Sequence, residues 1–417
     1  MLQKPKGTKD YFYKEANNYI KLVEYINNFM EVYNYNFIKT PTFESSELFK
    51  RSVGEETDIV NKETYDFIDK GERQMTLKPE ETASVVRCFL ENKLYALNDI
   101  NKFYYITPCF RYERPQSGRF REFNQFGVEV FGSSSPYMDA EVILLAYKFL
   151  SNLKIKGLKI KINTLGNEVS RNNYRKALVE YFKDKQDTLC ETCRERYKTN
   201  PLRILDCKVD KDNEIFKKVP KTIDYLDDES KNFFEELKSI LNDNEVPYEI
   251  DTNLVRGLDY YTHTVFEIVS DNEDLGPANT ICGGGRYNNL VKELGGPETG
   301  AVGFALGIER LLTILETEEI NFSERKIDAY IMNLNSAKDT FYLIEELRNA
   351  GFITETNYEV KSMKSLWKEV DKFNPTYVLI LGEDELKEGI VTIKDNLTKE
   401  SVQIKKGEIV EYLTMNI

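Results

Sequence analysis

The chain has 417 residues, 41% of them hydrophobic and 30% charged, and its formal net charge is −13. This length predicts two or three domains. The composition excludes a helical membrane protein, since no apolar run approaches the ~20 residues that span a bilayer. The acidity excludes a non-specific nucleic-acid coat, although it leaves room for a local basic groove.

The amino-terminal stretch MLQKPKGTKDYFYKE is polar and lacks the apolar region of a signal peptide. The six cysteines lie at uneven spacings that do not make a disulfide framework. Both observations favour a reducing, cytoplasmic location.

The first predicted element is an amphipathic helix over residues 14–34, because apolar side chains recur at three- and four-residue steps from Ile20 to Met30. Residues 35–44 are predicted to form a strand, in which Pro41 marks an edge or a bend.

An arginine-rich hairpin is predicted next. Two strands, residues 101–113 and 121–132, flank a turn that contains Pro115 and Gly118. Four arginines gather there in an otherwise acidic chain, namely Arg111, Arg114, Arg119 and Arg121. A solvated, salt-bridged hairpin is the plain interpretation, and a site for an anionic ligand is the alternative.

The second strand of this hairpin separates two kinds of side chain, since neighbouring residues of a strand point to opposite faces. One face carries Phe123, Gln125, Gly127 and Glu129, and the other carries Asn124, Phe126, Val128 and Val130. The first face would offer an amide and a carboxylate to a small ligand, with the glycine leaving room. A solvent-facing strand would show the same alternation.

Further along, residues 139–152 are predicted to form a helix and residues 158–166 a strand. The highly charged, helical stretch 169–245 is predicted to be an insertion. Strands then resume, and residues 300–315 run from a glycine-rich strand into a helix. From about residue 326, strands and helices alternate in a small α/β domain of roughly ninety residues.

Arg111, Arg256 and Arg310 each lie at a predicted strand end or just after a glycine. Guanidinium groups bind phosphate and carboxylate oxygens in pairs, so their convergence beside aromatic residues would suit a polyphosphate next to a base. The stretch CGGGRYNNL, residues 282–290, has neither a Walker A ending nor a G-x-G-x-x-G spacing. A tight strand-to-helix turn is therefore its favoured interpretation.

Three cysteines are candidate zinc ligands. Cys190 and Cys193 have the C-x-x-C spacing of half a zinc site, and Cys207 follows. A fourth ligand is missing nearby, although Cys282 or a carboxylate could supply it. Buried free cysteines are the favoured alternative.

The chain contains a single histidine, His263. Catalysis by Ser–His–Asp or Cys–His groups is confined to its surroundings. The scarcity favours a reaction that depends on positioning and charge stabilisation, such as adenylate or phosphoryl transfer.

Over its whole length the chain resembles the bacterial histidyl-tRNA synthetases, a family of class II aminoacyl-tRNA synthetases. Residues 37–49, 110–132 and 303–312 resemble class II motifs 1, 2 and 3. RGLDYYT and GGGRYNNLV resemble the two histidyl signatures, LKPEETASVVR resembles the L-R-P-E-x-T element, and YVLILGEDEL resembles part of the anticodon-binding domain.

The resemblance implies an α+β fold with a catalytic domain on a six-stranded antiparallel sheet. The catalytic domain would comprise residues 1–168 and 246–322, interrupted by the helical insertion at 169–245. Residues 326–417 would form the C-terminal α/β anticodon-binding domain.

The resemblance also implies roles for the residues that would bind ATP. Arg111 would bind the α-phosphate and Arg310 the γ-phosphate, while Glu113 and Phe123 would hold the adenine. Arg256 would contact both the histidine carboxylate and the α-phosphate, so Arg256 and Arg111 would be catalytic.

Six further residues would bind histidine, namely Glu80, Thr82, Gln125, Glu129, Tyr261 and Tyr287. Glu129 and Tyr261 would recognise the imidazole ring, which offers one donor and one acceptor when neutral. The tRNA acceptor stem would meet Arg114, Gln116 and Arg119.

The implied reaction joins L-histidine and ATP, with Mg²⁺, into histidyl-adenylate and passes the histidyl group to tRNA(His), in a homodimer. Two features depart from the family pattern, since Lys78 replaces an arginine and Asn288-Asn289 replaces Asp-Gly. An inactive regulatory paralogue of the kind that serves ATP phosphoribosyltransferase is one alternative. A class II synthetase of another specificity is a second.

His263 is expected not to act as a catalytic base, because the attacking carboxylate is already ionised. Regular alternation would put Tyr261, His263 and Val265 on one face, with His263 roughly 7 Å from Tyr261. Our hypothesis is that the scarcity of histidine lets the chain be made when histidine is short, and chance composition is the alternative.

Overall fold

The computed structural model describes residues 2–54, 57, 59–115, 118–207, 209–210, 213–256, 258, 260–272, 279–322 and 326–417. The chain divides into two compact units, Met1–Phe322 and Ser323–Ile417. Among the described helices, none is long and apolar enough to cross a membrane.

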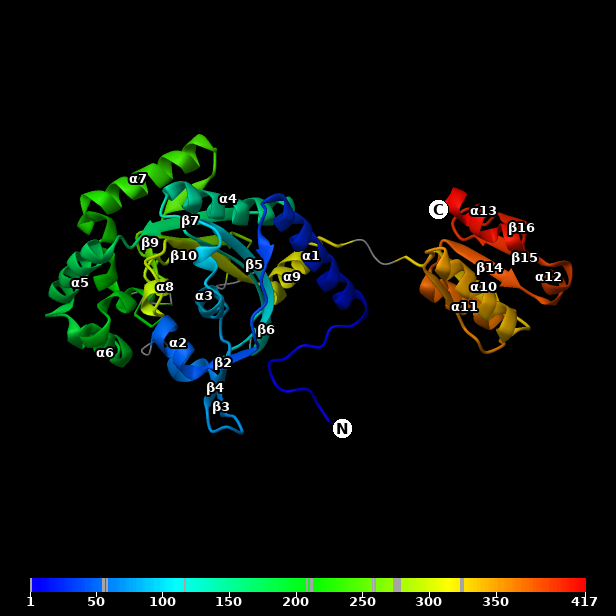
Figure 1. The fold of residues 1–417 in the computed structure, drawn as a ribbon, viewed down its shortest axis with the longest axis horizontal. Coiled ribbons are helices and arrows are strands. Elements are labelled where there is room, and N and C mark those ends of the chain that lie inside the picture. Colours follow the sequence, from blue (N-terminus) through cyan, green and yellow to red (C-terminus); the bar gives the residue numbers. More distant parts are fainter. Residues whose placement is uncertain are drawn as a thin grey trace. The chain divides into compact units, whose positions relative to one another are not determined.

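A large sheet organises the first unit (Figure 1). Its strands lie in the order β1 (Asn36–Phe37), β5 (Asn101–Phe110), β6 (Glu122–Phe131), β11 (Ala301–Gly307), β10 (Thr280–Arg286), β9 (Thr262–Ser270), β7 (Leu158–Thr164) and β8 (Tyr248–Ile250). The six central strands are antiparallel, as predicted. The expectation of only six strands is wrong, because β1 and β8 each add a short parallel pairing at an edge.

Helices cover one face of this sheet (Figure 1). The larger hydrophobic core joins side chains of the sheet to those of α1 (Tyr13–Val32), α4 (Pro136–Asn152), α7 (Asp228–Asp243) and α9 (Ile308–Thr317). In α1 the buried residues are Leu22, Ile26 and Met30, spaced four apart. Ile20 was predicted to lie on this apolar face but is 54% exposed, because the buried face begins at Leu22 and Ile20 does not share its four-residue spacing.

The opposite face carries a second core and leaves space for a cavity. This core packs side chains of α3 (Thr82–Glu91) and α8 (Leu290–Glu293) against the sheet. A three-stranded sheet adjoins α3 in sequence, in the order β2 (Phe43–Ser45), β4 (Gln74–Leu77) and β3 (Tyr65–Ile68), and α2 (Ser46–Val53) follows β2. The strand predicted over 35–44 is therefore two short strands separated around Pro41.

The stretch predicted to be an insertion contains helices and turns. Its helices are α5 (Glu168–Phe182), α6 (Glu191–Thr199) and α7, and short helical turns include Pro201–Asp206, Glu214–Lys218 and Thr222–Tyr225. The part before α7 has a small hydrophobic core of its own, built around Tyr174, Leu178 and Phe182 of α5.

The second unit is an α/β domain with a five-stranded sheet. Its strand order is β13 (Thr354–Thr356), β12 (Ala329–Asn333), β14 (Tyr377–Leu381), β15 (Ile390–Asp395) and β16 (Ser401–Lys405). Its helices are α10 (Ala337–Asn349), α11 (Met363–Phe373), α12 (Glu383–Glu388) and α13 (Ile409–Asn416). Strands and helices alternate from β12 to β15, as predicted.

Candidate active site

A cavity of about 430 Å³ opens between the sheet and the second core. The predicted site residues that line it are Glu80, Thr82, Arg111, Glu113, Arg119, Phe123, Gln125, Glu129, Arg256, Tyr261, Tyr287 and Arg310. Of the other two, Arg114 lies in an exposed position of the hairpin loop, and Gln116 lies outside the described residues. Segments more than two hundred residues apart therefore meet at one place.

Strand β6 presents its polar face to the cavity, as the alternation predicted. Phe123, Gln125 and Glu129 line the cavity, while Phe126 and Val128 of the opposite face are buried in the larger core. The solvent-facing alternative for this strand is wrong. The room expected at Gly127 is taken up by protein, since a Cβ there would lie 2.4 Å from the Tyr105 hydroxyl.

Glu129 is the most enclosed carboxylate of the cavity, at 1% exposure. Its Oε1 accepts hydrogen bonds from Thr82 Oγ1 at 2.7 Å and Tyr105 Oη at 3.2 Å, and its Oε2 accepts one from Tyr287 Oη. Burial raises the pKa of Glu129 to about 8, although these hydroxyl donors favour the charged form. Three donors fix the direction in which the carboxyl group can meet a ligand.

Glu80 lies at the start of α3 and binds the free amides of its first turn. The Thr82 N–H donates to Oε2 and the Ala83 N–H to Oε1, both at 2.9 Å. A carboxylate is favoured at this position because the first N–H groups of a helix have no partners within the helix. Burial nevertheless raises the pKa of Glu80.

The strand-to-helix turn predicted for 282–290 is confirmed, because β10 ends at Arg286 and α8 begins at Leu290, although the glycines lie within the strand and not in the turn. The glycines allow close approach of site residues to the sheet. A Cβ at Gly283 would lie 2.4 Å from Arg256 Nη2, and a Cβ at Gly303 of the neighbouring strand would lie 2.1 Å from Glu129 Oε2. Larger residues would displace both side chains.

Arg256 is held by an ion pair between its Nη1 and Glu267 of β9. Glu267 is oriented further by Thr280, whose hydroxyl donates to Oε2 at 3.1 Å. Glu267 was not among the predicted site residues, although it also lines the cavity. A lone carboxylate within the apolar strand THTVFEIVS was the available signal.

The remaining arginines form a positively charged group. Arg111 lies over the ring of Phe123, with its guanidinium carbon 5.4 Å from the ring centroid, and Arg119 Nη1 lies 3.5 Å from Glu113 Oε2. Burial, together with the charge of Arg119, lowers the pKa of Arg310. Arg111 and Arg119 share one carboxylate, Glu113. An anionic ligand would offset the remaining positive charge, which favours the anionic-ligand interpretation of the hairpin.

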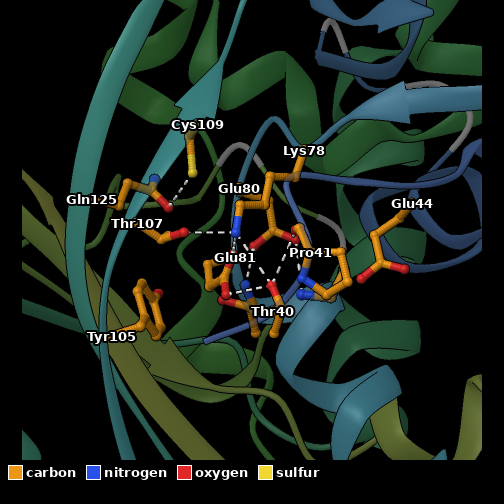
Figure 2. A network of polar contacts seen from close by, with 12 residues as sticks. Thr40, Pro41, Glu44, Lys78, Glu80, Glu81, Tyr105, Thr107, Cys109 and Gln125 are labelled. Atoms are coloured by element: carbon orange, nitrogen blue, oxygen red, sulfur yellow. Dashed lines mark hydrogen bonds and ion pairs between the residues drawn. The ribbon is translucent and has the colours of Figure 1, made fainter. Parts of the chain in front are cut away.

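Lys78 lies in a buried polar network (Figure 2). Its ammonium contacts Glu81 Oε2 at 2.7 Å, Thr107 Oγ1 at 2.6 Å and Thr40 Oγ1 at 3.2 Å. Burial raises the pKa of Glu81 to about 7 despite this ion pair. The lysine thus makes two hydrogen bonds and one ion pair within the protein, so its role here is to connect the end of β4 to β5 and to the loop before β2.

A second carboxylate that the sequence analysis missed is Glu309, at the start of α9. It accepts hydrogen bonds from the backbone N–H of Asn124, at 2.9 Å to Oε2, and from the Tyr11 hydroxyl, at 2.9 Å to Oε1. It therefore fixes the start of β6 against α9, close to Arg310. Its place within GIERLL was the signal, since an acidic residue is rare on a helix face that is otherwise apolar.

His263 packs against Phe233 of α7, with 4.8 Å between ring centroids, and the described residues lining the cavity do not include it. The predicted common face of Tyr261, His263 and Val265 is wrong. The register of β9 shifts between Val265 and Thr262, where His263 adopts a φ of 43°. Burial lowers the pKa of His263 to about 4, so its ring is neutral.

The three candidate zinc ligands lie in the small core of the insertion, away from the cavity-lining residues. Cys282 is in β10 and lines the cavity instead. A carboxylate, Asp210, completes the group with Cys190, Cys193 and Cys207.

Comparisons with known proteins agree with this geometry. The histidyl-tRNA synthetase family profile matches residues 7–311, and the profile of the anticodon binding domain matches residues 328–416. The histidine--tRNA ligase of Geobacillus sp. (strain WCH70) is 47% identical over 415 residues, covering 99% of this chain and 98% of that protein. The corresponding ligase of Bacillus subtilis (strain 168) is 45% identical over 417 residues, covering 99% and 98%.

The crystal structure of apo S. aureus histidyl-tRNA synthetase superimposes with a TM-score of 0.86 at 38% identity, covering 99% of this chain and 100% of that one. The match extends across the catalytic sheet and the second unit alike. The chain belongs to the histidyl-tRNA synthetase family.

Proposed function

We propose that this chain ligates L-histidine to tRNA(His) in two steps. Histidine and ATP first give histidyl-adenylate and pyrophosphate, and the histidyl group then passes to tRNA with release of AMP. The observation that carries the proposal is the cavity, in which buried carboxyl groups and an amide lie together with a group of arginines. The anticodon-binding domain at 328–416 supports tRNA as a substrate.

In this proposal, the acidic part of the cavity binds histidine. Glu80, Thr82 and Gln125 would hold its α-amino group, and Glu129, Tyr261 and Tyr287 would surround the imidazole. A ring without the matching donor and acceptor would leave buried polar groups unpaired, which is the physical basis for selecting histidine.

The arginines would bind ATP and stabilise the reacting phosphate. Arg111 and Arg310 would hold the α- and γ-phosphates, with the adenine between Phe123 and Glu113. Arg256 would contact the histidine carboxylate and the α-phosphate together, reducing their repulsion and stabilising the charge that develops on phosphorus. Arg114, Gln116 and Arg119 would meet the acceptor end of tRNA.

Magnesium is proposed to enter with ATP. Glu267 is a carboxylate among the cavity arginines that has no role toward the adenine, and it would supply an oxygen ligand. This fits an ion that typically binds one or two carboxylates and otherwise substrate phosphates and water. When bound, it would neutralise phosphate charge.

We further propose a homodimer in the cytoplasm. The segment that resembles motif 1 exposes two large aromatic residues, Phe37 at 53% and Phe43 at 49%. Burial of such side chains against a second subunit would remove apolar surface from water.

The test is ATP–pyrophosphate exchange with each of the twenty amino acids in turn. Exchange is expected with histidine alone, and charging of tRNA(His) should follow. Exchange with another amino acid would show that the enzyme is not specific for histidine. Absence of exchange with all of them would favour the regulatory paralogue, although full-length relatives at 45–47% identity favour the ligase.

Glu129→Gln is expected to raise the KM for histidine by roughly 10- to 100-fold, because a mismatched buried polar group costs about 1–3 kcal/mol. The KM for ATP should change less than about twofold, since the arginines are untouched. Glu122→Gln, at the exposed start of the same strand, is the control and should leave both constants unchanged. If only the KM for ATP rose, Glu129 would belong to the ATP subsite and the proposed assignment to histidine would be wrong.

The same variant gives a signature in pH dependence. Because the folded pKa of Glu129, about 8, exceeds the ordinary value of a glutamate, its contribution to stability is present at low pH and is lost as pH rises through about 8. Wild type should therefore lose stability relative to Glu129→Gln between about pH 5 and 9. Urea unfolding at several pH values measures this difference.

A further inference from the structure

Four potential metal ligands converge in the insertion, between α5 and α7. Cys190 is the N-cap of α6, and Cys193 lies in the first turn of that helix. Cys207 follows the turn Pro201–Asp206, and Asp210 lies three residues later. Cys193, Cys207 and Asp210 are at most 7% exposed.

The distances within this group suit a metal ion with tetrahedral coordination. All ligand atoms lie within 4.8 Å of one another, and Cys190 Sγ and Cys207 Sγ are 3.7 Å apart. Two thiolates bound to one zinc at about 2.3 Å in tetrahedral geometry are separated by about 3.8 Å. A disulfide would instead require about 2.05 Å.

Backbone hydrogen bonds already orient these ligands. The Cys190 N–H donates to the Asp210 carboxylate, at 3.0 Å to Oδ2 and 3.3 Å to Oδ1. The Asp210 N–H donates to Cys207 Sγ at 3.4 Å. Such contacts fix ligand direction and stabilise negative charge on the ligand atoms, as the outer contacts of structural metal sites do.

The segment around these ligands has only a small hydrophobic core, so a bound metal ion would add to its stability. Its core consists of eight buried side chains, namely Tyr174, Leu178, Phe182, Leu189, Cys193, Ile204, Cys207 and Val219. In its described part the segment before α7 has helices and turns without a strand. Cores this small supply little stability, and metal ions or disulfides commonly make up the difference.

We propose that Cys190, Cys193, Cys207 and Asp210 bind one structural Zn²⁺. Three soft thiolates favour zinc over magnesium or calcium, and four protein ligands leave no open position for catalysis. The ion connects the start of α6 to the turn after Pro201–Asp206, so it stabilises the fold of the insertion.

The first measurement uses the full-length wild-type protein, purified under reducing conditions without added chelator. Elemental analysis is expected to give about one zinc per chain. Replacement by Co²⁺ should give sulfur-to-cobalt charge-transfer absorption and the visible bands of tetrahedral cobalt. Less than a tenth of an equivalent of zinc together with no cobalt–thiolate absorption would overturn the proposal. Intact mass showing an oxidised Cys190–Cys207 pair in the cell would overturn it too.

Variants then assign the ligands. Cys193→Ser and Asp210→Ala should each lower zinc occupancy by about tenfold and lower the midpoint of the first thermal transition. Cys88→Ser, at a half-buried cysteine outside the group, is the control and should keep one zinc. If both ligand variants kept full occupancy, the site would lie elsewhere. The cobalt spectrum is measured on the wild-type protein. It can therefore still contradict the proposal if a variant fails to fold.

Discussion

Arg256→Ala is expected to lower the rate of adenylate formation by roughly 10²–10³, the usual cost of removing one preorganised group at a developing charge. Arg256 is pressed against the strand at Gly283 and held by Glu267, so its direction is set before substrates bind. Its Nε is buried and has no hydrogen-bond partner among the described residues.

Pyrophosphate exchange at saturating ATP and histidine measures this effect. Arg256→Lys keeps the charge and loses the paired donors, so it should recover only part of the rate. Arg73→Ala, at an exposed arginine paired with Asp69, is the control and should behave as wild type. Exchange near the wild-type rate in Arg256→Ala would remove this residue from the catalytic group.

Arg286→Leu is expected to destabilise the first unit by about 3–5 kcal/mol, the cost of leaving a buried charge without its partner. Arg286 and Asp139 both have fully buried side chains, and Arg286 Nε donates to Asp139 Oδ1 at 2.9 Å. The same guanidinium donates to the carbonyl oxygens of Ser133, at 2.7 Å, and Ser135, at 3.2 Å. It therefore connects the centre of the sheet to the start of α4.

Urea unfolding of the full-length chain measures the loss. The double variant Arg286→Leu/Asp139→Leu should recover part of it, because no buried charge then remains. Arg73→Leu should cost less than about 0.5 kcal/mol, since exposed ion pairs contribute little. A loss of similar size in Arg73→Leu and Arg286→Leu would show that this buried pair is not a main source of stability.

The hydrophobic pattern of the sequence predicted those strands and helices in which each face keeps one environment, buried or exposed, along its whole length. Alternation correctly divided β6 into a cavity face and a core face, and the strand and helix order of the second unit followed from periodicity. Twelve of the residues predicted for the site meet at one cavity. Phe123, Gln125 and Glu129 lie on β6, and the others come from helix starts and from loops next to the strands. Their individual roles stay predictions.

The errors share a physical cause, which is contact with distant parts of the chain. The turn predicted for 282–290 is present, but the glycines at 283–285 lie in the strand before it, where they accommodate the close approach of Arg256, Tyr261 and Phe304. Nothing local in β9 announces the register shift at His263, which depends on pairing with β10. Asp210 could not be assigned to the cysteines because a carboxylate has no characteristic spacing.

Glu80 both binds the first turn of α3 and lines the cavity, and this limits how the site can be changed by laboratory evolution. Both of its carboxylate oxygens already bind the first amides of α3, and Thr82 from that same turn donates to Glu129. A randomised library at Glu80 would thus lose helix and pocket together, and few of its members would fold well enough to be screened. A search for variants that charge histidine analogues should instead diversify Tyr261 and Tyr287, which line the cavity where the imidazole is proposed to bind.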